Sequence, residues 1–435
     1  MRISLLLSAW LLSWSVTGAP EIQHWKTSKG TGVYFVEAHE LPMVDIRLSF
    51  DAGSARDPEA REGLASFTSS LLSEGADGLD ADELGFQFER LGANFSSGAG
   101  DDYASISLRS LVDSKKLKPA IKNLKRVINA PDFPEQAIER QRQRFLVGIQ
   151  QRKQSPGAMA NKAFYKAVFA SHPYAHPTDG TEQSMKAISR KDIIAFHKEY
   201  YAAANGIIAI VGDLGKAEAE KLAEELTSGL RRGNKARPLP EVPSLEQPAV
   251  IRQGHPSSQT HILLGQPGIK RGDPDYFPLY VGNHILGGSG LVSVLFEEIR
   301  EKRALSYSAY SYFSPMRVKG AFVAGLSTRA DQAEEALEIL RKVIKSFIEE
   351  GPDAEALEAA KRNITGGFPL RIDSNGNLLG YATTIGFYNL PLDYLDTFNE
   401  KVMAVTLQDI KAAMASRIDP EKLVAVMVGP IAGEG

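Results

Sequence analysis

The sequence contains no cysteine among its 435 residues. This absence excludes a disulfide framework, a thiol nucleophile and a cysteine-ligated metal. A large excess of charge of one sign is also lacking, because the net charge is only −3. Nothing in the charge balance therefore indicates nucleic acid or an anionic membrane as a partner. The chain is longer than one hydrophobic core usually serves, so we expect two domains or a duplicated unit.

Long apolar runs are scarce, and the one that stands out lies at the start of the chain. Arg2 precedes an apolar stretch from Ile3 to about Trp14, and small residues follow it up to Ala19. This layout predicts a secretory signal peptide over residues 1–19. A transmembrane anchor is the alternative, but the run is shorter than the roughly 18 residues that a span needs. We expect an exported protein with no membrane span in the mature chain.

Four landmarks occur twice, in the same order and 216 or 217 residues apart. They are Asp57-Pro58 with Asp273-Pro274, the helices ending at Ile128 and Ile344, Asp192-Ile193 with Asp409-Ile410, and Val211-Gly212 with Val428-Gly429. Such a repeat indicates a duplicated unit. Residues 231–248 are rich in proline, which predicts an extended linker. We place the two domains at residues 22–230 and 249–435.

Each half has the same coarse order of elements. An alternating strand leads to two helices, then to further strands, then to more helices and a closing strand rich in β-branched residues. Strands and helices mixed without strict alternation predict an α+β fold, with a sheet covered by helices on one face. Two tandem homologous α/β domains joined by a linker predict a clamshell.

The histidines and the glycine-rich segment offer weak chemistry. His172 and His176 are four residues apart, but each precedes a proline, so we expect a loop there instead of a helical metal site. The segment Gly287-Gly288-Ser289-Gly290 fits neither a nucleophile elbow nor a phosphate loop, because the flanking residues of both motifs are missing. From the residues alone, it is a flexible turn before a helix.

Three serines share one face of a predicted amphipathic helix within residues 61–78. Ser66, Ser69 and Ser70 stand at i, i+3 and i+4, the spacing at which a helix presents catalytic ligands. An independent serine hydrolase is one interpretation, but no elbow and no oriented base accompany these residues. Serine hydroxyls by themselves are poor metal ligands at neutral pH.

A helix end and a strand start bring together an arginine and a tyrosine. The helix is expected to end around Lys302 and the strand to start near Leu305, with Arg300 in the last helical turn and Tyr307 on the strand. A guanidinium and a phenol placed there could hold a peptide carbonyl or stabilise an oxyanion. A solvated helix end beside a core tyrosine is the alternative, and the residues alone leave both open.

Several strings resemble signatures of the pitrilysin-type zinc peptidases, the family of insulysin and mitochondrial processing peptidase. The segment "LGGSGLVSVLFEEIREKRALSYSAYSYF" resembles the signature of the second domain, with Ala304 where glycine is usual. "FPEQAIERQRQRF", "SHPYAHPTDGT" and "YYAAANGIIAIVGDL" resemble first-domain signatures. The resemblance covers essentially the whole mature chain. It implies the two-domain metallohydrolase fold of the processing peptidase type.

The resemblance also implies which family residues the three serines replace. Ser66 stands where the family has its first zinc histidine, Ser69 where it has the catalytic glutamate, and Ser70 where it has the second histidine. The third ligand is a glutamate on a later helix, where this chain has Val147 and Gly148. A catalytic zinc needs three side-chain ligands and a general base alongside. The resemblance therefore implies that this chain neither binds a catalytic zinc nor hydrolyses peptides alone.

Arg300 and Tyr307 match the pair that active members use to engage substrate, and the glycine-rich segment matches a substrate-binding loop. Short bacterial members are often paired, with the zinc in one chain and the Arg/Tyr pair in the other. The resemblance thus implies the non-zinc subunit of a periplasmic heterodimeric peptidase that acts on unfolded peptides. Its partner would be a homologous chain that carries His-x-x-Glu-His and the zinc. The alternative is an inert scaffold or peptide-binding protein of the same fold.

Overall fold

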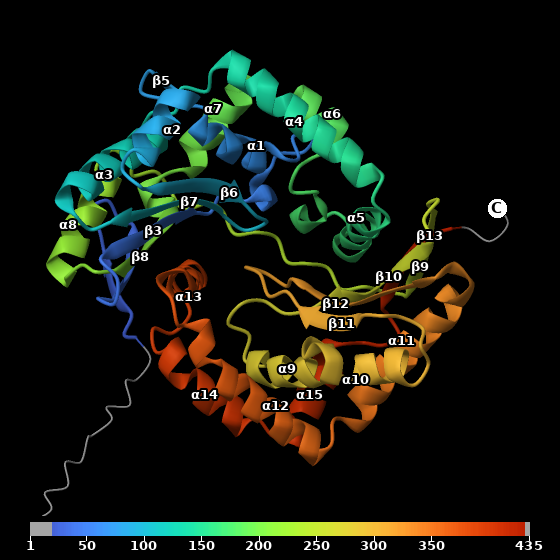
Figure 1. The fold of residues 1–435 in the computed structure, drawn as a ribbon. Coiled ribbons are helices and arrows are strands. Elements are labelled where there is room, and N and C mark those ends of the chain that lie inside the picture. The colour runs from blue at the N-terminus through green and yellow to red at the C-terminus, as the bar shows by residue number, and fades with distance from the viewer. Residues whose placement is uncertain (1–19, 431–435) are drawn as a thin grey trace, which may run out of the picture.

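The computed structural model describes residues 20–430, which form two lobes facing each other (Figure 1). The first half holds a six-stranded sheet in the order β1-β2-β8-β3-β7-β6. Its strands are β1 (Gln23–Lys26), β2 (Gly32–Glu37), β3 (Met43–Phe50), β6 (Asn94–Ala99), β7 (Ala104–Leu111) and β8 (Gly206–Gly212). A short hairpin of β4 (Gly75–Ala76) and β5 (Leu79–Asp80) lies apart from it.

The second half holds a five-stranded sheet in the order β11-β12-β10-β13-β9. Its strands are β9 (Ala249–Gly254), β10 (Gln259–Pro267), β11 (Ala309–Phe313), β12 (Ala321–Arg329) and β13 (Val424–Gly429). Read in reverse, this order repeats that of the first sheet without β1. Both sheets also contain one parallel pair, β2 with β8 and β9 with β13, among antiparallel neighbours. The duplication predicted from the repeated landmarks is therefore present in the topology.

The helices repeat in the same way. The first half has α1 (Leu64–Ser70), α2 (Ala81–Glu89), α3 (Ser114–Asn129), α4 (Glu135–Lys153), α5 (Pro156–Phe169), α6 (Glu182–Ala187), α7 (Arg190–Tyr200) and α8 (Lys216–Thr227). The second has α9 (Tyr276–Asn283), α10 (Val294–Phe296), α11 (Ala333–Glu350), α12 (Ala354–Gly367), α13 (Asn375–Tyr388), α14 (Tyr394–Ala404) and α15 (Leu407–Arg417). Residues 231–248 between the halves contain no helix or strand. The predicted α+β fold with two tandem domains is confirmed.

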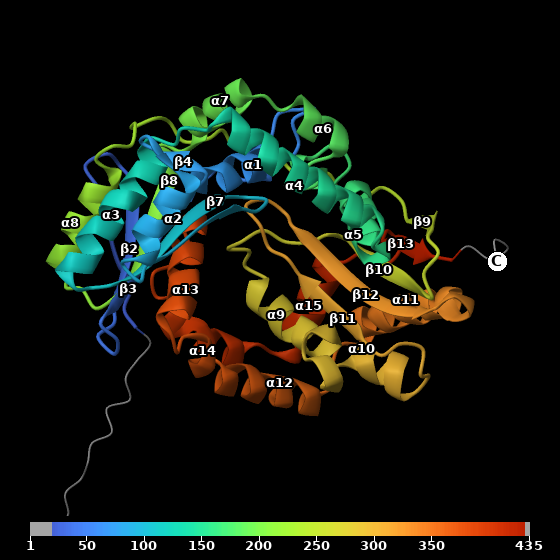
Figure 2. The same cartoon turned by 45° about the horizontal axis from the view of Figure 1, so that its top comes forward.

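Each sheet is covered on both faces, which corrects the prediction of helices on one face only. Ile208 and Ile210 of β8 belong to the core under the first half's own helices. Ala209 and Val211 point the other way and join a core that includes Ala382 of α13, a helix of the second half. Helix α5 of the first half packs in turn on β10 and β13. The two halves thus exchange one helix each, as both views show (Figures 1 and 2).

Burial on both faces explains why the closing strands β8 and β13 read as continuous apolar runs instead of alternating patterns. The exchanged helices also approach closely. A Cβ atom at Gly386 of α13 would lie 2.5 Å from the Tyr34 ring of β2, so only glycine fits there.

The halves also meet at the tips of two equivalent hairpins, β6–β7 and β11–β12. The buried Asp102 carboxylate accepts a hydrogen bond from the Arg317 backbone N–H at 2.9 Å and one from the Tyr388 hydroxyl at 2.8 Å. The Tyr174 hydroxyl donates to the same carboxylate. Arg317 and Tyr388 belong to the second half, so this carboxylate ties the two lobes together.

Export stays a prediction. The predicted signal peptide covers residues 1–19, which lie outside the described part of the chain. Within residues 20–430, no helix is both long and apolar enough to cross a bilayer.

Candidate functional site

Helix α1, which carries the three serines, is held at its start by a buried carboxylate. Asp57 accepts hydrogen bonds from the backbone N–H groups of Gly63 at 2.7 Å and Ala65 at 2.8 Å. These are donors that the first helical turn leaves without partners. Gly63 itself has a φ of 91°, a conformation that favours glycine. Burial raises the pKa of Asp57 to about 8. The first of the repeated landmarks therefore positions α1.

The serines do share one side of α1, as the spacing predicts, but two of the three are buried in packed protein. Ser66 is 9% exposed and Ser69 is fully buried. The hydroxyl of Ser69 lies beside that of Tyr201, whose pKa is raised by burial. Ser70 donates to the Phe67 carbonyl at 2.8 Å. Within residues 20–430, no hydrogen bond joins any of the three hydroxyls to a histidine, so the serine hydrolase interpretation gains no support.

At the position that the resemblance assigns to the third ligand, the structure places a glycine next to an arginine side chain. Val147 of α4 is 56% exposed. Gly148 is half-buried, and a Cβ there would lie 3.6 Å from Nη1 of Arg152. Arg152 is ion-paired with Asp179 at 3.1 Å. A guanidinium at this place repels a divalent cation. Throughout residues 20–430, no group of three or more His, Asp or Glu side chains could hold a metal ion.

The histidine pair lies in a loop, as predicted. Residues Pro173–Ala175 form a single 3₁₀ turn, and the buried His172 caps it by accepting from the Tyr174 backbone N–H at 3.1 Å. The other ring nitrogen of His172 lies 3.0 Å from the Pro240 carbonyl of the linker. His172 thus connects this turn to the linker and is not placed as a metal ligand.

The structure brings Arg300 and Tyr307 together. A π-helix, Glu297–Glu301, carries Arg300, whose Nη1 donates to the Tyr307 carbonyl at 3.3 Å. The guanidinium carbon lies 5.8 Å from the centre of the Tyr307 ring and 4.8 Å from that of Phe296. Tyr307 is 83% exposed. The alternative of a core tyrosine is therefore wrong, and the pair presents a phenol and a guanidinium to the surroundings.

One detail of this segment differs from the prediction. Strand β11 begins at Ala309, so Tyr307 lies in the turn before the strand and not on it. The alternating sequence pattern predicts a strand that is too long. Pairing with β12 begins only at Ala309, which lies opposite Leu326.

The glycine-rich segment is packed more tightly than a flexible turn. Gly287 and Gly288 belong to a short π-helix, His284–Gly288. A Cβ at Gly287 would lie 2.4 Å from the Ser311 backbone nitrogen of β11, so glycine lets the two segments touch. Ser289 follows the π-helix, and Gly290, at a φ of 64°, starts a 3₁₀ turn. Whether these four residues bind substrate stays a prediction.

The sequence analysis missed a set of arginines and tyrosines that line two adjoining cavities, the larger of which lies between the halves. They are Arg47, Tyr103, Arg271, Tyr276, Tyr280, Arg371, Tyr381 and Tyr394. The spacing of Tyr276 and Tyr280, four residues apart on one helix, was the available local signal. The arginines come from distant segments, and only the fold brings them together.

Comparisons with known proteins agree with this architecture. A family model described as "Insulinase (Peptidase family M16)" matches residues 33–182, and one described as "Peptidase M16 inactive domain" matches residues 187–364. A crystal structure of a "peptidase M16 inactive domain" from Pseudomonas fluorescens is 39% identical, with a TM-score of 0.92. The match covers 95% of this chain and 99% of that one.

More distant relatives carry contrasting names. The "Non-peptidase homolog YmxG" of Helicobacter pylori is 25% identical over 401 residues, covering 91% of each chain. An "Uncharacterized zinc protease" of Rickettsia bellii is 26% identical over 425 residues, covering 94% of this chain and 98% of the relative. The match to the Pseudomonas structure over nearly its whole length, together with the two family models, shows that this chain belongs to the M16 (insulinase) peptidase family.

Proposed function

We propose that this chain is the non-zinc subunit of a heterodimeric zinc metallopeptidase that acts on unfolded peptides. In this role, the chain supplies Arg300 and Tyr307 to a composite active site whose zinc lies in a homologous partner with a His-x-x-Glu-His motif. The observation that carries the proposal is the contrast between two places in one chain. The positions that correspond to the family's three zinc ligands hold Ser66, Ser70 and Gly148, whereas Arg300 and the exposed Tyr307 are in contact.

The chemistry of the pair suits a peptide substrate. A guanidinium can donate to a carbonyl oxygen from a rigid fork, and a phenol can donate a further hydrogen bond. Such donors stabilise the negative charge that develops on the oxygen when the carbonyl is attacked. Arg300 donates one N–H to the Tyr307 backbone carbonyl, which holds the guanidinium beside this residue. A zinc ion bound in the partner would supply the activated water.

The test uses the complex isolated from its native host. We expect a stoichiometric partner with the zinc motif to co-purify with the tagged chain, with zinc in the eluate. Arg300→Ala and Tyr307→Phe should each lower the peptidase activity of the complex by about 10²-fold, as the removal of one oxyanion donor does. Arg303→Ala is the matched control, because its guanidinium binds Glu298 of its own segment.

The same experiment decides between this proposal and an inert scaffold, which the name of the Helicobacter relative favours. Full activity in both Arg300→Ala and Tyr307→Phe complexes would favour the scaffold. Purification of a lone chain or a self-dimer without zinc would contradict the proposed composite active site. The proposal also places the complex in the periplasm, on the strength of the predicted signal peptide. Detection of the mature N-terminus in a periplasmic extract tests that part.

A further inference from the structure

Two adjoining cavities lie in the second half, and the larger one extends to the first half. Their volumes are about 480 and 570 Å³, and both are lined by Arg271, Tyr276, Tyr280 and Arg371. The larger one is also lined by Arg47 of β3, which belongs to the first half. Cavities of roughly 300–1,000 Å³ are the size that binds small organic ligands.

The lining is positively charged and carries no compensating acid. Neither cavity is lined by an aspartate or a glutamate. His284, which also lines the smaller cavity, adds no charge near neutral pH, because burial lowers its pKa. Three arginines are therefore the charged groups on these walls.

In the described part of the chain, the side-chain partners of these guanidinium groups are hydroxyls and not carboxylates. Arg371 donates to the Tyr280 hydroxyl, and Arg47 donates to the Ser107 hydroxyl at 3.0 Å. The buried Nε of Arg271 has no hydrogen-bond partner within residues 20–430. A buried donor without a partner is unfavourable, so a ligand that accepts a hydrogen bond from it gains affinity. Arg417 nearby shows the usual arrangement, since it binds Asp273 at 2.9 Å and Asp275 at 2.7 Å.

The other walls are flat and aromatic. The rings of Tyr276 and Tyr280 stack with their centres 5.8 Å apart, and those of Tyr310 and Tyr312 stack 6.0 Å apart. Burial raises the pKa of Tyr280, so its hydroxyl stays protonated and able to donate. A ligand for this site therefore needs an anion and an aromatic group close together.

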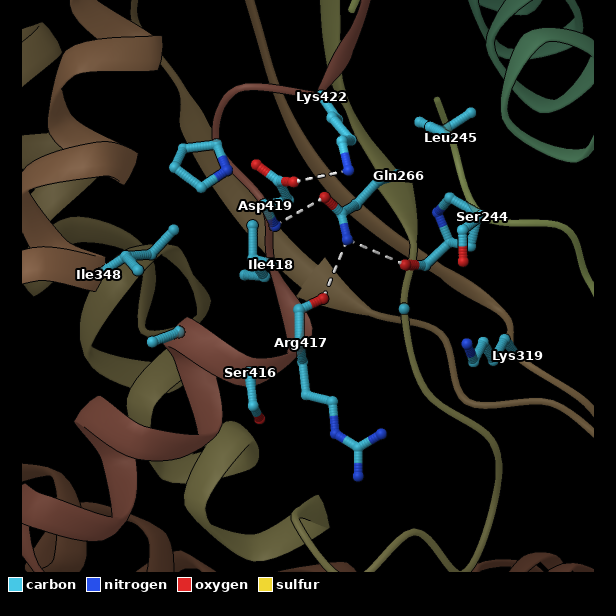
Figure 3. A pocket seen from close by; sticks show the side chains of 14 residues that line it. Ser244, Leu245, Gln266, Lys319, Ile348, Ser416, Arg417, Ile418, Asp419 and Lys422 are labelled. Atoms are coloured by element: carbon cyan, nitrogen blue, oxygen red, sulfur yellow. Dashed lines mark hydrogen bonds and ion pairs between the residues drawn. The ribbon is translucent and has the colours of Figure 1, made fainter. Parts of the chain in front are cut away.

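In a third cavity, of about 460 Å³, polar groups of the lining form hydrogen bonds and ion pairs with one another (Figure 3). There the Gln266 amide donates to the Arg417 carbonyl at 2.9 Å and accepts from the Asp419 backbone N–H at 3.0 Å. Lys422 in turn is paired with Asp419 at 3.2 Å. Because these polar groups are already paired, a ligand would gain little from hydrogen bonds to them.

We propose that the two adjoining cavities together bind the C-terminal carboxylate of a peptide that ends in an aromatic residue. A carboxylate matches the planar fork of a guanidinium, and an aromatic side chain stacks on the tyrosine walls. A terminal residue joins these two groups within a few bonds, as the adjoining walls require. The choice of a peptide rests on the proposed function. Since Arg47 and Arg271 come from different halves, the bound terminus bridges the two lobes.

The experiment uses the isolated mature chain and calorimetry, with N-acetyl-Ala-Phe bearing a free carboxylate and its C-terminal amide as the pair of probes. We expect the acid to bind at least 10-fold more tightly than the amide. Arg271→Gln and Arg371→Gln should each remove at least 10-fold of that affinity. Arg329→Gln should bind as wild type does, because that arginine pairs with Asp331 on the surface. Melting curves of all three variants report whether they fold.

Other results would overturn the proposal. Equal binding of acid and amide would show that the carboxylate is not recognised. Unchanged affinity in both folded cavity variants would place the binding elsewhere. Displacement of the acid by an equal concentration of N-acetyl-Glu amide or inorganic phosphate would show a general anion site. None of these measurements needs the partner or zinc, so failure here is distinguishable from failure of the composite enzyme.

Discussion

Ala304 ends the segment that carries Arg300, and it does so in the left-handed conformation, at a φ of 54°. Its backbone N–H donates to the Arg300 carbonyl at 2.9 Å, and that of Leu305 donates to the Ile299 carbonyl at 3.0 Å. This is the hydrogen-bond pattern of a helix end that favours glycine. The family signature that this segment resembles has glycine here, and alanine bears a strain that glycine would not.

We therefore expect Ala304→Gly to stabilise the protein by about 0.5–1 kcal/mol, the left-handed penalty of alanine less the entropy gained by the unfolded chain. Urea unfolding measures the change. Ala195→Gly on the exposed face of α7 is the control, and it should destabilise by about 1 kcal/mol. A loss of stability in Ala304→Gly would contradict the strain argument.

A second residue-scale prediction concerns His197 of α7. Its ring stacks on Tyr201 with centres 4.8 Å apart, and burial lowers its pKa from 6.5 to about 4. The unfolded chain then binds more protons than the folded one between these values. The stability is complete above pH 6.5 and is lost as the pH falls toward 4.

The loss at pH 5 relative to pH 7 should be about 2 kcal/mol from this group. Urea unfolding at both pH values measures it, and His197→Gln should reduce the difference. His24→Gln, at an exposed position, is the control and should leave the difference as it is. An identical pH dependence in wild type and His197→Gln would contradict this prediction.

At the scale of the element, α1 combines a well-fixed start with a buried serine face. Asp57 and Gly63 still shape its start, but Ser69 is now fully buried beside Tyr201. A carboxylate at the Ser69 position would be fully buried. The side of α1 that carries Ser66 and Ser69 is thus packed against protein.

We expect Ser69→Glu to cost about 3 kcal/mol or more, because a buried polar group without a partner is expensive. Ser70→Glu, at a half-buried position, is the matched control and should cost less than about 1 kcal/mol. Thermal and urea unfolding of both variants provide the comparison. Equal, small costs would mean that this face of α1 is still open.

At the scale of the whole molecule, the two lobes are held by exchanged helices and by the hairpin tips. Asp102 accepts hydrogen bonds from two tyrosine hydroxyls and one backbone N–H, and two of these donors belong to the second half. Beside it, burial and the Asp102 charge raise the pKa of Asp101 to about 6. The contact therefore concentrates buried polar groups at the junction of the lobes.

Asp102→Ala should lower the free energy of unfolding by about 3–5 kcal/mol, since it leaves buried donors without an acceptor. It should also increase the radius of gyration in small-angle X-ray scattering as the lobes separate. Asp331→Ala, on the surface, serves as the control. Wild-type stability and size in Asp102→Ala would show that the exchanged helices alone hold the lobes.

The sequence by itself determined the features that local patterns record. The repeated landmarks revealed the duplication, and the spacing of Ser66, Ser69 and Ser70 placed them on one side of a helix. The proline after His172 ruled out a helical metal pair. These inferences hold because side-chain periodicity and proline geometry act within a few residues.

The tertiary structure alone decided which surfaces meet. The apolar runs of β8 and β13 indicate burial on both faces, but only the fold shows that α13 and α5 are exchanged to cover them. Likewise, Arg47, Arg271 and Arg371 line adjoining cavities although they are far apart in the chain. Burial leaves a local trace in the sequence, whereas the identity of the partner depends on contacts between distant segments, which no local pattern encodes.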